Sequence, residues 1–223
     1  MDERNYFGLL RRRERLTPTR RGWALFALGL AMFSTFTVRG IYPFLAVTEP
    51  VAGGFLVVEG WVSDAAMEAA VAEFRRHRYA MVYVTGGPVE HGAWMNRYKT
   101  FADAGRATLI ELGLDPKEVQ PIPSKQVRKD RTNAEAEAFG RWIRQSGAAV
   151  KTVHLISEGA HARRSRLLFQ RALCGDVEVG VTSVPRGDFD PDHWWRSSAG
   201  VREVMGETVA YGYARLLFWL ADE

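Results

Sequence analysis

The sequence predicts an α/β fold: a three-layer αβα sandwich with a mostly parallel sheet, preceded by one N-terminal transmembrane helix. Between residues 54 and 220, five short runs rich in Val, Ile and Leu alternate with segments of helical pattern. Parallel strands need right-handed helical crossovers, so this alternation favours helices on both faces of a sheet. An uncharged apolar run precedes the first strand, and 223 residues suit one domain with an anchor.

The transmembrane signal anchor is expected over residues 22–46. Residues 23–38 carry no charge, and the chain stays largely apolar after Arg39. A full span needs about 20 residues, which is reached if Arg39 extends its charged end toward the lipid headgroups. Trp23 and Tyr42 lie near the two ends, where amphipathic rings prefer to sit. A cleaved signal peptide and a buried core helix are the alternatives.

The charge of the N-terminal tail predicts the orientation. Residues 1–21 hold seven Arg and three acidic residues, whereas the rest of the chain holds 23 basic and 23 acidic residues. Basic residues beside a span stay cytoplasmic. We therefore expect a single-pass protein of the bacterial inner (plasma) membrane, with a cytoplasmic tail over residues 1–21 and an extracytoplasmic domain over residues 50–223, which lies in the periplasm if the cell has two membranes. Because that domain is neutral, no nucleic-acid partner is expected.

Apolar runs mark the strands, and capping residues and glycines bound the helices. The expected strands cover residues 54–58, 81–84, 119–122, 151–156 and 177–184. One helix is expected to begin after Ser63, and four more are expected over residues 97–112, 132–145, 163–173 and 200–220. The third strand is weak because Pro121 and Pro123 fall in or beside it.

Ligands of such folds bind at the carboxyl ends of the strands, so the loops there hold the first candidates. Glu59 follows the first strand and is either a general base or a structural counter-ion. Thr85, Gly86 and Gly87 end the second strand. The two glycine amides suit close approach to an anion, and a plain tight turn is the alternative.

Two helix starts hold further candidates. Arg131 and Thr132 begin the helix after the third strand, where a guanidinium can hold a phosphate or carboxylate and Thr132 can cap. His161 precedes Arg163 and Arg164 after the fourth strand. A histidine there suits acid–base chemistry, and two cations at the positive end of a helix call for a compensating anion. A capping histidine and a solvent-exposed arginine are the alternative.

Several site classes lack their signatures. The chain has no G-x-G-x-x-G or G-x-x-x-x-G-K-[ST] motif, no G-x-S-x-G elbow and no H-x-x-x-H or H-E-x-x-H spacing. Cys174 is the one cysteine, which rules out a disulfide scaffold and a cysteine-based zinc site. No metal site is expected, and the sequence assigns no cofactor.

At these loops the chain resembles the bacterial ElyC/SanA/YdcF family, over residues 53–190 and in its N-terminal anchor. The family's Ser/Thr-Gly-Gly motif is matched by Thr85-Gly86-Gly87, and its Ser/Thr…His-x-x-Arg motif by Ser157, His161 and Arg164. Its Thr-x-Glu-Asn-Ala helix start reads Thr132-Asn133-Ala134-Glu135-Ala136 here, so Ala134 and Glu135 stand at the family's Glu and Asn positions, and Glu59 is expected to supply the missing carboxylate. The resemblance implies a Rossmann-like fold and a link to envelope integrity, through lipid-carrier or peptidoglycan metabolism.

Three functions remain open. The first is an envelope protein that acts on or binds an anionic, phosphate-bearing lipid-linked or glycan intermediate, with Arg131, Arg163 and Arg164 holding the anion and His161 and Glu59 moving protons. The second is a non-enzymatic envelope scaffold that docks through Trp194 and Trp195 and the last helix. The third is a cytoplasm-facing domain that binds a nucleotide or S-adenosylmethionine, by analogy with the fold alone.

Overall fold

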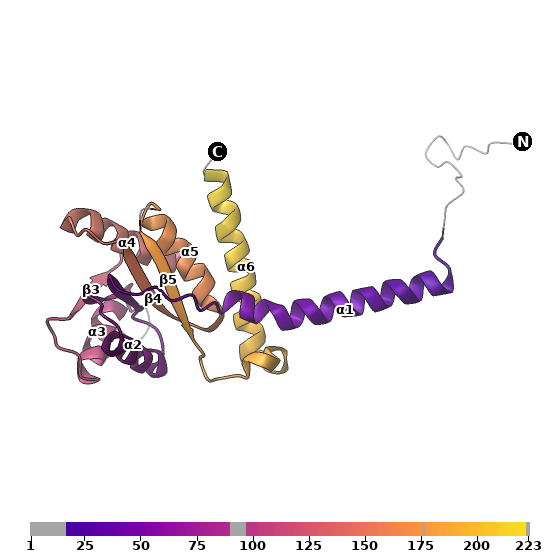
Figure 1. Cartoon of the computed structure of the whole chain (residues 1–223), viewed down its shortest axis with the longest axis horizontal. Helices are drawn as coiled ribbons and strands as arrows, with labels where there is room; N and C mark the ends of the chain where they lie inside the picture. Colours follow the sequence, from indigo (N-terminus) through magenta and orange to yellow (C-terminus); the bar gives the residue numbers. More distant parts are fainter. Residues whose placement is uncertain (1–16, 90–96, 176, 222–223) are drawn as a thin grey trace, which may run out of the picture. The chain divides into compact units, whose positions relative to one another are not determined.

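The computed structural model describes residues 17–89, 97–175 and 177–221 (Figure 1). The chain divides into two compact units, Met1–Val38 and Arg39–Glu223. Of the predicted basic tail, residues 1–16 lie outside the described residues. The second unit contains the α/β domain together with the last turns of the N-terminal helix.

The N-terminal helix α1 (Arg20–Leu45) is long and apolar enough to cross a membrane. Its best 18-residue window has a mean hydropathy of 1.6, and none of that window is buried against protein. Within the part of the chain that the structure describes, α1 is the one helix with these properties. Length and composition thus agree with the predicted anchor, while its orientation stays a prediction.

The sheet is fully parallel and has the order β3-β2-β1-β4-β5. Its strands are β1 (Phe55–Glu59), β2 (Met81–Gly86), β3 (Val119–Pro123), β4 (Thr152–Glu158) and β5 (Glu178–Val184). The chain first winds outward from β1 to β3 and then returns to place β4 on the other side of β1. This reversal between β1 and β4 is the position at which open parallel sheets bind ligands.

Helices cover both faces of the sheet, as predicted for a Rossmann-like αβα sandwich (Figure 1). The helices of the domain are α2 (Asp64–Arg76), α3 (Phe101–Glu111), α4 (Arg131–Ser146), α5 (Ala162–Ala172) and α6 (Ser198–Ala221), with short 3-10 helices at Gly159–His161 and Pro191–Arg196. Leu56 and Val58 of β1 face the α2–α3 core, and Val57 faces the α4–α5 core. Both faces are buried, which explains the continuous apolar runs.

Some element boundaries differ from the prediction for local reasons. The helix expected at residue 97 begins at Phe101, because the Thr100 hydroxyl accepts a hydrogen bond from the Asp103 amide (3.1 Å) and caps it. Ser157 and Glu158, expected in a loop, pair with β5 and end strand β4. The proline-containing third strand does form, at the edge of the sheet, where a missing N–H is tolerated.

The connecting segment, residues 46–51, is packed onto the domain. Glu49 forms an antiparallel bridge with Val181 on the outer edge of β5, and the Ser183 amide donates to the Thr48 hydroxyl (3.1 Å). Leu45 is fully buried just before it. The segment covers the outer edge of β5, which would otherwise present unpaired backbone groups.

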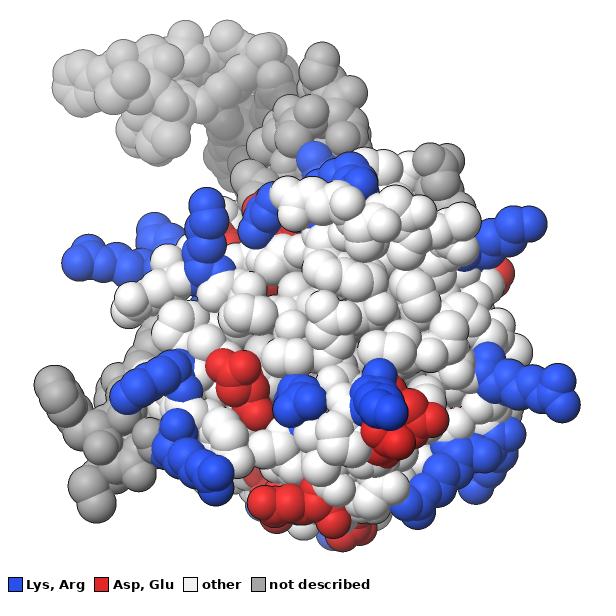
Figure 2. Space-filling view, turned by 90° about the vertical axis from the view of Figure 1, so that its left-hand side faces the viewer, with Lys and Arg blue, Asp and Glu red and all other residues white. Residues whose placement is uncertain are grey.

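The surface charge is mixed. On the side that Figure 2 shows, Lys and Arg side chains stand apart from one another, with Asp and Glu between them and a broad uncharged area. This face carries no continuous basic patch of the kind that binds nucleic-acid backbones.

Candidate functional site

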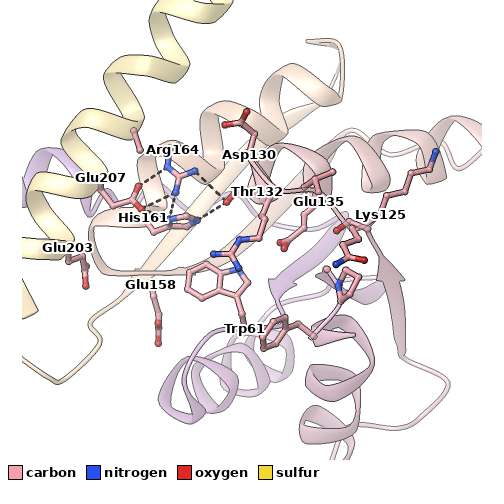
Figure 3. A pocket seen from close by; sticks show the side chains of 18 of the residues that line it. Trp61, Lys125, Asp130, Thr132, Glu135, Glu158, His161, Arg164, Glu203 and Glu207 are labelled. Atoms are coloured by element: carbon pink, nitrogen blue, oxygen red, sulfur yellow. Dashed lines mark hydrogen bonds and ion pairs between the residues drawn. The ribbon is translucent and has the colours of Figure 1, made fainter. Parts of the chain in front are cut away.

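A cavity of about 470 Å³ opens at the carboxyl edge of the sheet, beside the reversal between β1 and β4 (Figure 3). Trp61 follows β1, Glu158 ends β4, and His161 and Arg164 begin α5. The start of α4 and one face of α6 complete the walls. The winding of the chain therefore gathers groups that lie up to about 150 residues apart in sequence.

His161 is the centre of the polar network. Its Nδ1 lies 2.9 Å from Glu207 Oε1, and its Nε2 lies 3.4 Å from Glu59 Oε1 and 3.3 Å from Thr132 Oγ1. The Trp61 ring packs edge-on against the imidazole at 4.9 Å. These contacts fix the ring between two carboxylates at the wall of the cavity.

Arg164 is held by the same carboxylate on α6. Its Nε and Nη2 donate to the two oxygens of Glu207, at 2.7 and 2.9 Å, which is the paired geometry that makes arginine–carboxylate bonds strong. Arg164 Nη2 also lies 2.9 Å from His161 Nδ1. Two donors cannot share a hydrogen bond, so both cations donate to Glu207 when His161 is protonated (Figure 3).

Glu59 lies behind His161 rather than at the cavity surface. It is 1% exposed, and its oxygens accept hydrogen bonds from Ser157 Oγ (2.5 Å) and Ser165 Oγ (2.8 Å). Glu59 does not line the cavity. The structure thus gives it the position of a group that orients and charges His161, not of a base that reaches a ligand directly.

The two carboxylates determine the protonation of the site. Burial alone would lower the pKa of His161, but the charges and hydrogen bonds of Glu59 and Glu207 outweigh it and raise that pKa to about 9. Burial would raise the pKa of Glu207, but its bonds to Arg164 and His161 outweigh burial and lower that pKa to about 2. At neutral pH, His161 is a cation and Glu207 an anion.

Glu135 is a cavity residue to which the sequence assigns no role. It is 3% exposed, and its Oε2 has no hydrogen-bond partner among the described residues. Burial, followed by the nearby charge of Glu59, raises the pKa of Glu135 to about 8, although a backbone hydrogen bond from Gly87 opposes this. At neutral pH Glu135 therefore keeps its proton and can donate it to a ligand. Its spacing from Thr132, one helical turn, is the signal in the sequence that could have identified it.

The other carboxylates of the cavity are occupied by the protein itself. Glu158 accepts a hydrogen bond from the Ser63 amide just before α2 (2.8 Å), and Glu203 accepts one from the Ala160 amide in the 3-10 helix that precedes α5 (2.8 Å). Arg186 Nε lies 4.0 Å from Glu158 and 3.6 Å from Glu203. These acids complete helix termini and an ion-pair cluster, so they do not make the cavity a cation site. No group of three or more potential metal ligands occurs among the described residues.

The first residues of α4 and the segment before it add charged groups to the cavity. Lys125, Asp130, Arg131 and Thr132 line the cavity there. Asp130 occupies the N-cap position with a left-handed backbone (φ 56°), and its side chain makes no capping hydrogen bond. The helix start thus reaches the cavity without being capped by its own N-cap residue, in an orientation that favours an anion.

The remaining predicted residues fall into two groups. Gly87 and Thr132 line the cavity, whereas Ser157 and Thr85 are fully buried behind it. Gly86 is a packing position, because a Cβ there would lie 2.5 Å from the Ala102 nitrogen.

Arg163 is not brought to the cavity. It donates to the Phe44 carbonyl, and its guanidinium lies over the Phe44 ring at 4.1 Å. Of the two arginines at the start of α5, only Arg164 lines the site. The geometry gives no support to the expectation that Arg163 holds the anion.

Comparison with known proteins finds a distant structural similarity. No family model matches the sequence, and neither does any curated protein. A crystal structure of pantoate-beta-alanine (pantothenate synthetase) from Thermus thermophilus is similar at 18% identity and a TM-score of 0.31. The alignment covers 65% of this chain and 59% of that one. A similarity at this level does not extend to function.

Proposed function

We propose that this chain is a membrane-anchored envelope protein whose cavity binds an anionic, phosphate-bearing ligand and places it against proton donors. The observation that carries the proposal is the protonation of the cavity walls. His161 and Glu135 both hold protons at neutral pH, and Lys125 and Arg131 add positive charge. Phosphate oxygens are acceptors, so they match walls that carry the Lys125 and Arg131 cations and the protonated carboxyl of Glu135, whose Oε2 has no hydrogen-bond partner among the described residues.

The roles of the residues follow from their positions. Protonated His161 is the general acid, Glu135 is the second donor, and Glu59 and Glu207 keep His161 charged. Arg164 orients Glu207 and lies at the cavity wall. The resemblance to the ElyC/SanA/YdcF family supports an intermediate of lipid-carrier or peptidoglycan metabolism as the ligand class.

The pH dependence of binding tests this proposal. Glu135 ionises near pH 8, and His161 loses its charge near pH 9, so both changes weaken anion binding as the pH rises. Glu135→Gln keeps a donor but removes the first ionisation. We expect the affinity for farnesyl phosphate, measured by calorimetry in detergent, to fall from about pH 8 in the native protein and only near pH 9 in the variant. A phosphate monoester is already fully ionised above about pH 7, so its own titration does not interfere.

Glu137→Gln is the matched control, because Glu137 lies on the same helix but is 55% exposed and pairs with Arg141. It should leave the pH profile unchanged. Identical profiles for the native protein and Glu135→Gln would contradict the role of Glu135.

The membrane topology is a separate prediction. Alkaline phosphatase fused after Glu223 should be active, because the basic tail is expected to hold the N-terminus in the cytoplasm. An inactive fusion together with an active cytoplasmic reporter at the same site would contradict the envelope location. The alternative of a cytoplasmic nucleotide- or S-adenosylmethionine-binding domain would then be favoured.

A further inference from the structure

One face of α6 exposes a row of apolar side chains. The row, here called the α6 stripe, consists of Val201, Met205, Val209, Tyr213 and Leu216. Spacings of three and four residues place them along one side of the helix. Their exposed fractions run from 38% to 69%, so the described residues leave a large part of each side chain uncovered.

The opposite side of α6 belongs to the domain. Glu207 and Ala210 line the cavity, and Val204 and Ala214 are buried. The stripe therefore lies on the side of α6 that the described part of the domain leaves exposed. Exposed apolar rows of this length are typical of surfaces that contact a membrane or another protein.

The position of α6 indicates what that surface contacts. The Phe44 ring, in the last turn of α1, packs edge-on against Tyr211 of α6 at 5.7 Å. Phe44 is itself 44% exposed, so an exposed apolar side chain at the end of the predicted span lies beside α6, although Tyr211 is outside the α6 stripe. The Arg163 guanidinium over Phe44 adds a cation at this junction, as is common at the headgroup level of a membrane.

The composition of α6 suits a helix that lies on a membrane rather than one that crosses it. It has 24 residues, but Arg202, Glu203, Glu207 and Arg215 interrupt its apolar character, and it does not qualify as a span. The sequence after Leu216 continues as Leu217-Phe218-Trp219-Leu220. Tryptophan and apolar residues at a helix end are typical of segments in the membrane interface.

From these observations we infer that the α6 stripe rests on the outer surface of the lipid bilayer beside the exit of α1. This inference depends on the membrane anchoring in the proposed function. Because the other side of α6 lines the cavity, the helix separates the lipid headgroups from His161 and Glu207. A ligand whose phosphate is attached to a lipid then reaches the cavity by passing over α6.

Site-specific labelling in vesicles tests the inference. The full chain with Cys174→Ser carries one new cysteine, Val209→Cys, labelled with an environment-sensitive fluorophore and reconstituted into phosphatidylcholine–phosphatidylglycerol vesicles. Leu28→Cys on α1 is the membrane reference, and Glu111→Cys at the exposed end of α3 is the aqueous control. Nitroxide-bearing lipids should remove most of the fluorescence at positions 209 and 28 but not at 111.

Each other outcome overturns the inference in a recognisable way. Quenching at position 28 but not at 209 would leave the anchor intact and exclude the bilayer contact. Disulfide cross-linking of two chains through Val209→Cys, with no lipid quenching there, would make the stripe an interface between copies. Absence of quenching at both positions would reject the anchor, and with it the envelope location.

Discussion

Replacing Glu207 by Gln will destabilise the domain by about 3 kcal/mol near pH 6, because it leaves the largely buried Arg164 and His161 without their shared counter-charge. The side chains of Arg164 and Glu207 are only 17% and 16% exposed, so solvent screens their interaction little. Urea unfolding of the full chain in detergent measures this loss. Glu137→Gln on the exposed side of α4 should change stability little.

The same variant should change the pH profile of stability on the acid side. The pKa of Glu207 is lowered from 4.5 to about 2, so its stabilisation is complete above pH 4.5 and is lost as the pH falls toward 2. This loss of stability between pH 4.5 and about 2 should be much smaller in Glu207→Gln.

The alkaline side is governed by His161. The pKa of His161 is raised from 6.5 to about 9, so its stabilisation is complete below pH 6.5 and is lost as the pH rises through 9. In Glu207→Gln this loss of stability should be smaller and should be complete at a lower pH, because only Glu59 remains to raise the pKa of His161. If the stability of Glu207→Gln depended on pH as that of the native protein does, at both acid and alkaline pH, the described network of Glu207, His161 and Arg164 would be contradicted.

Replacing His161 by Gln is expected to weaken binding of farnesyl phosphate by about tenfold to a hundredfold at pH 7, the value of a hydrogen bond to a charged group. Gln keeps a polar side chain at the cavity wall but cannot carry the charge that Glu59 and Glu207 induce. Calorimetry measures the affinity, and circular dichroism shows whether the fold is kept. Arg164→Ala should weaken binding as well, through the loss of a cation at the wall and of its hold on Glu207.

The envelope scaffold makes the opposite prediction. If the protein only docks partners, His161→Gln and Arg164→Ala will leave its function in the cell unchanged. Trp195→Ala, in the segment before α6, will reduce that function. Trp195 suits this comparison better than Trp194, which is 6% exposed and whose replacement would disturb packing. Full function in both His161 and Arg164 variants would therefore reject the proposed binding site.

The fold could be predicted from the sequence because its signals are local. Continuous apolar runs such as the one ending at Val58 occur where a strand is buried on both faces, and glycines and capping residues bound the helices. The candidate residues at the strand ends followed from the parallel topology, which brings His161 and Thr132 within 3.3 Å.

The site residues that sequence reasoning misses depend on tertiary packing. Glu207 lies on the last helix, 46 residues after His161, and nothing near it in sequence indicates that α6 turns back onto the start of α5. In the sequence Glu135 only stands at the family's Asn position, and its burial and unpartnered oxygen are what distinguish it from the exposed Glu137. Arg163 and Arg164 are adjacent, yet helix geometry sends one to Phe44 and the other to Glu207.

The central position of β1 also bears on how the chain is made. β1 is the first strand to be synthesised, but one of its two neighbours, β4, begins at Thr152. Glu49, which precedes β1, can form its bridge with Val181 only after β5 has been synthesised. The sheet cannot be completed until nearly the whole domain has left the ribosome, so the early part of the chain stays accessible to chaperones until late in synthesis.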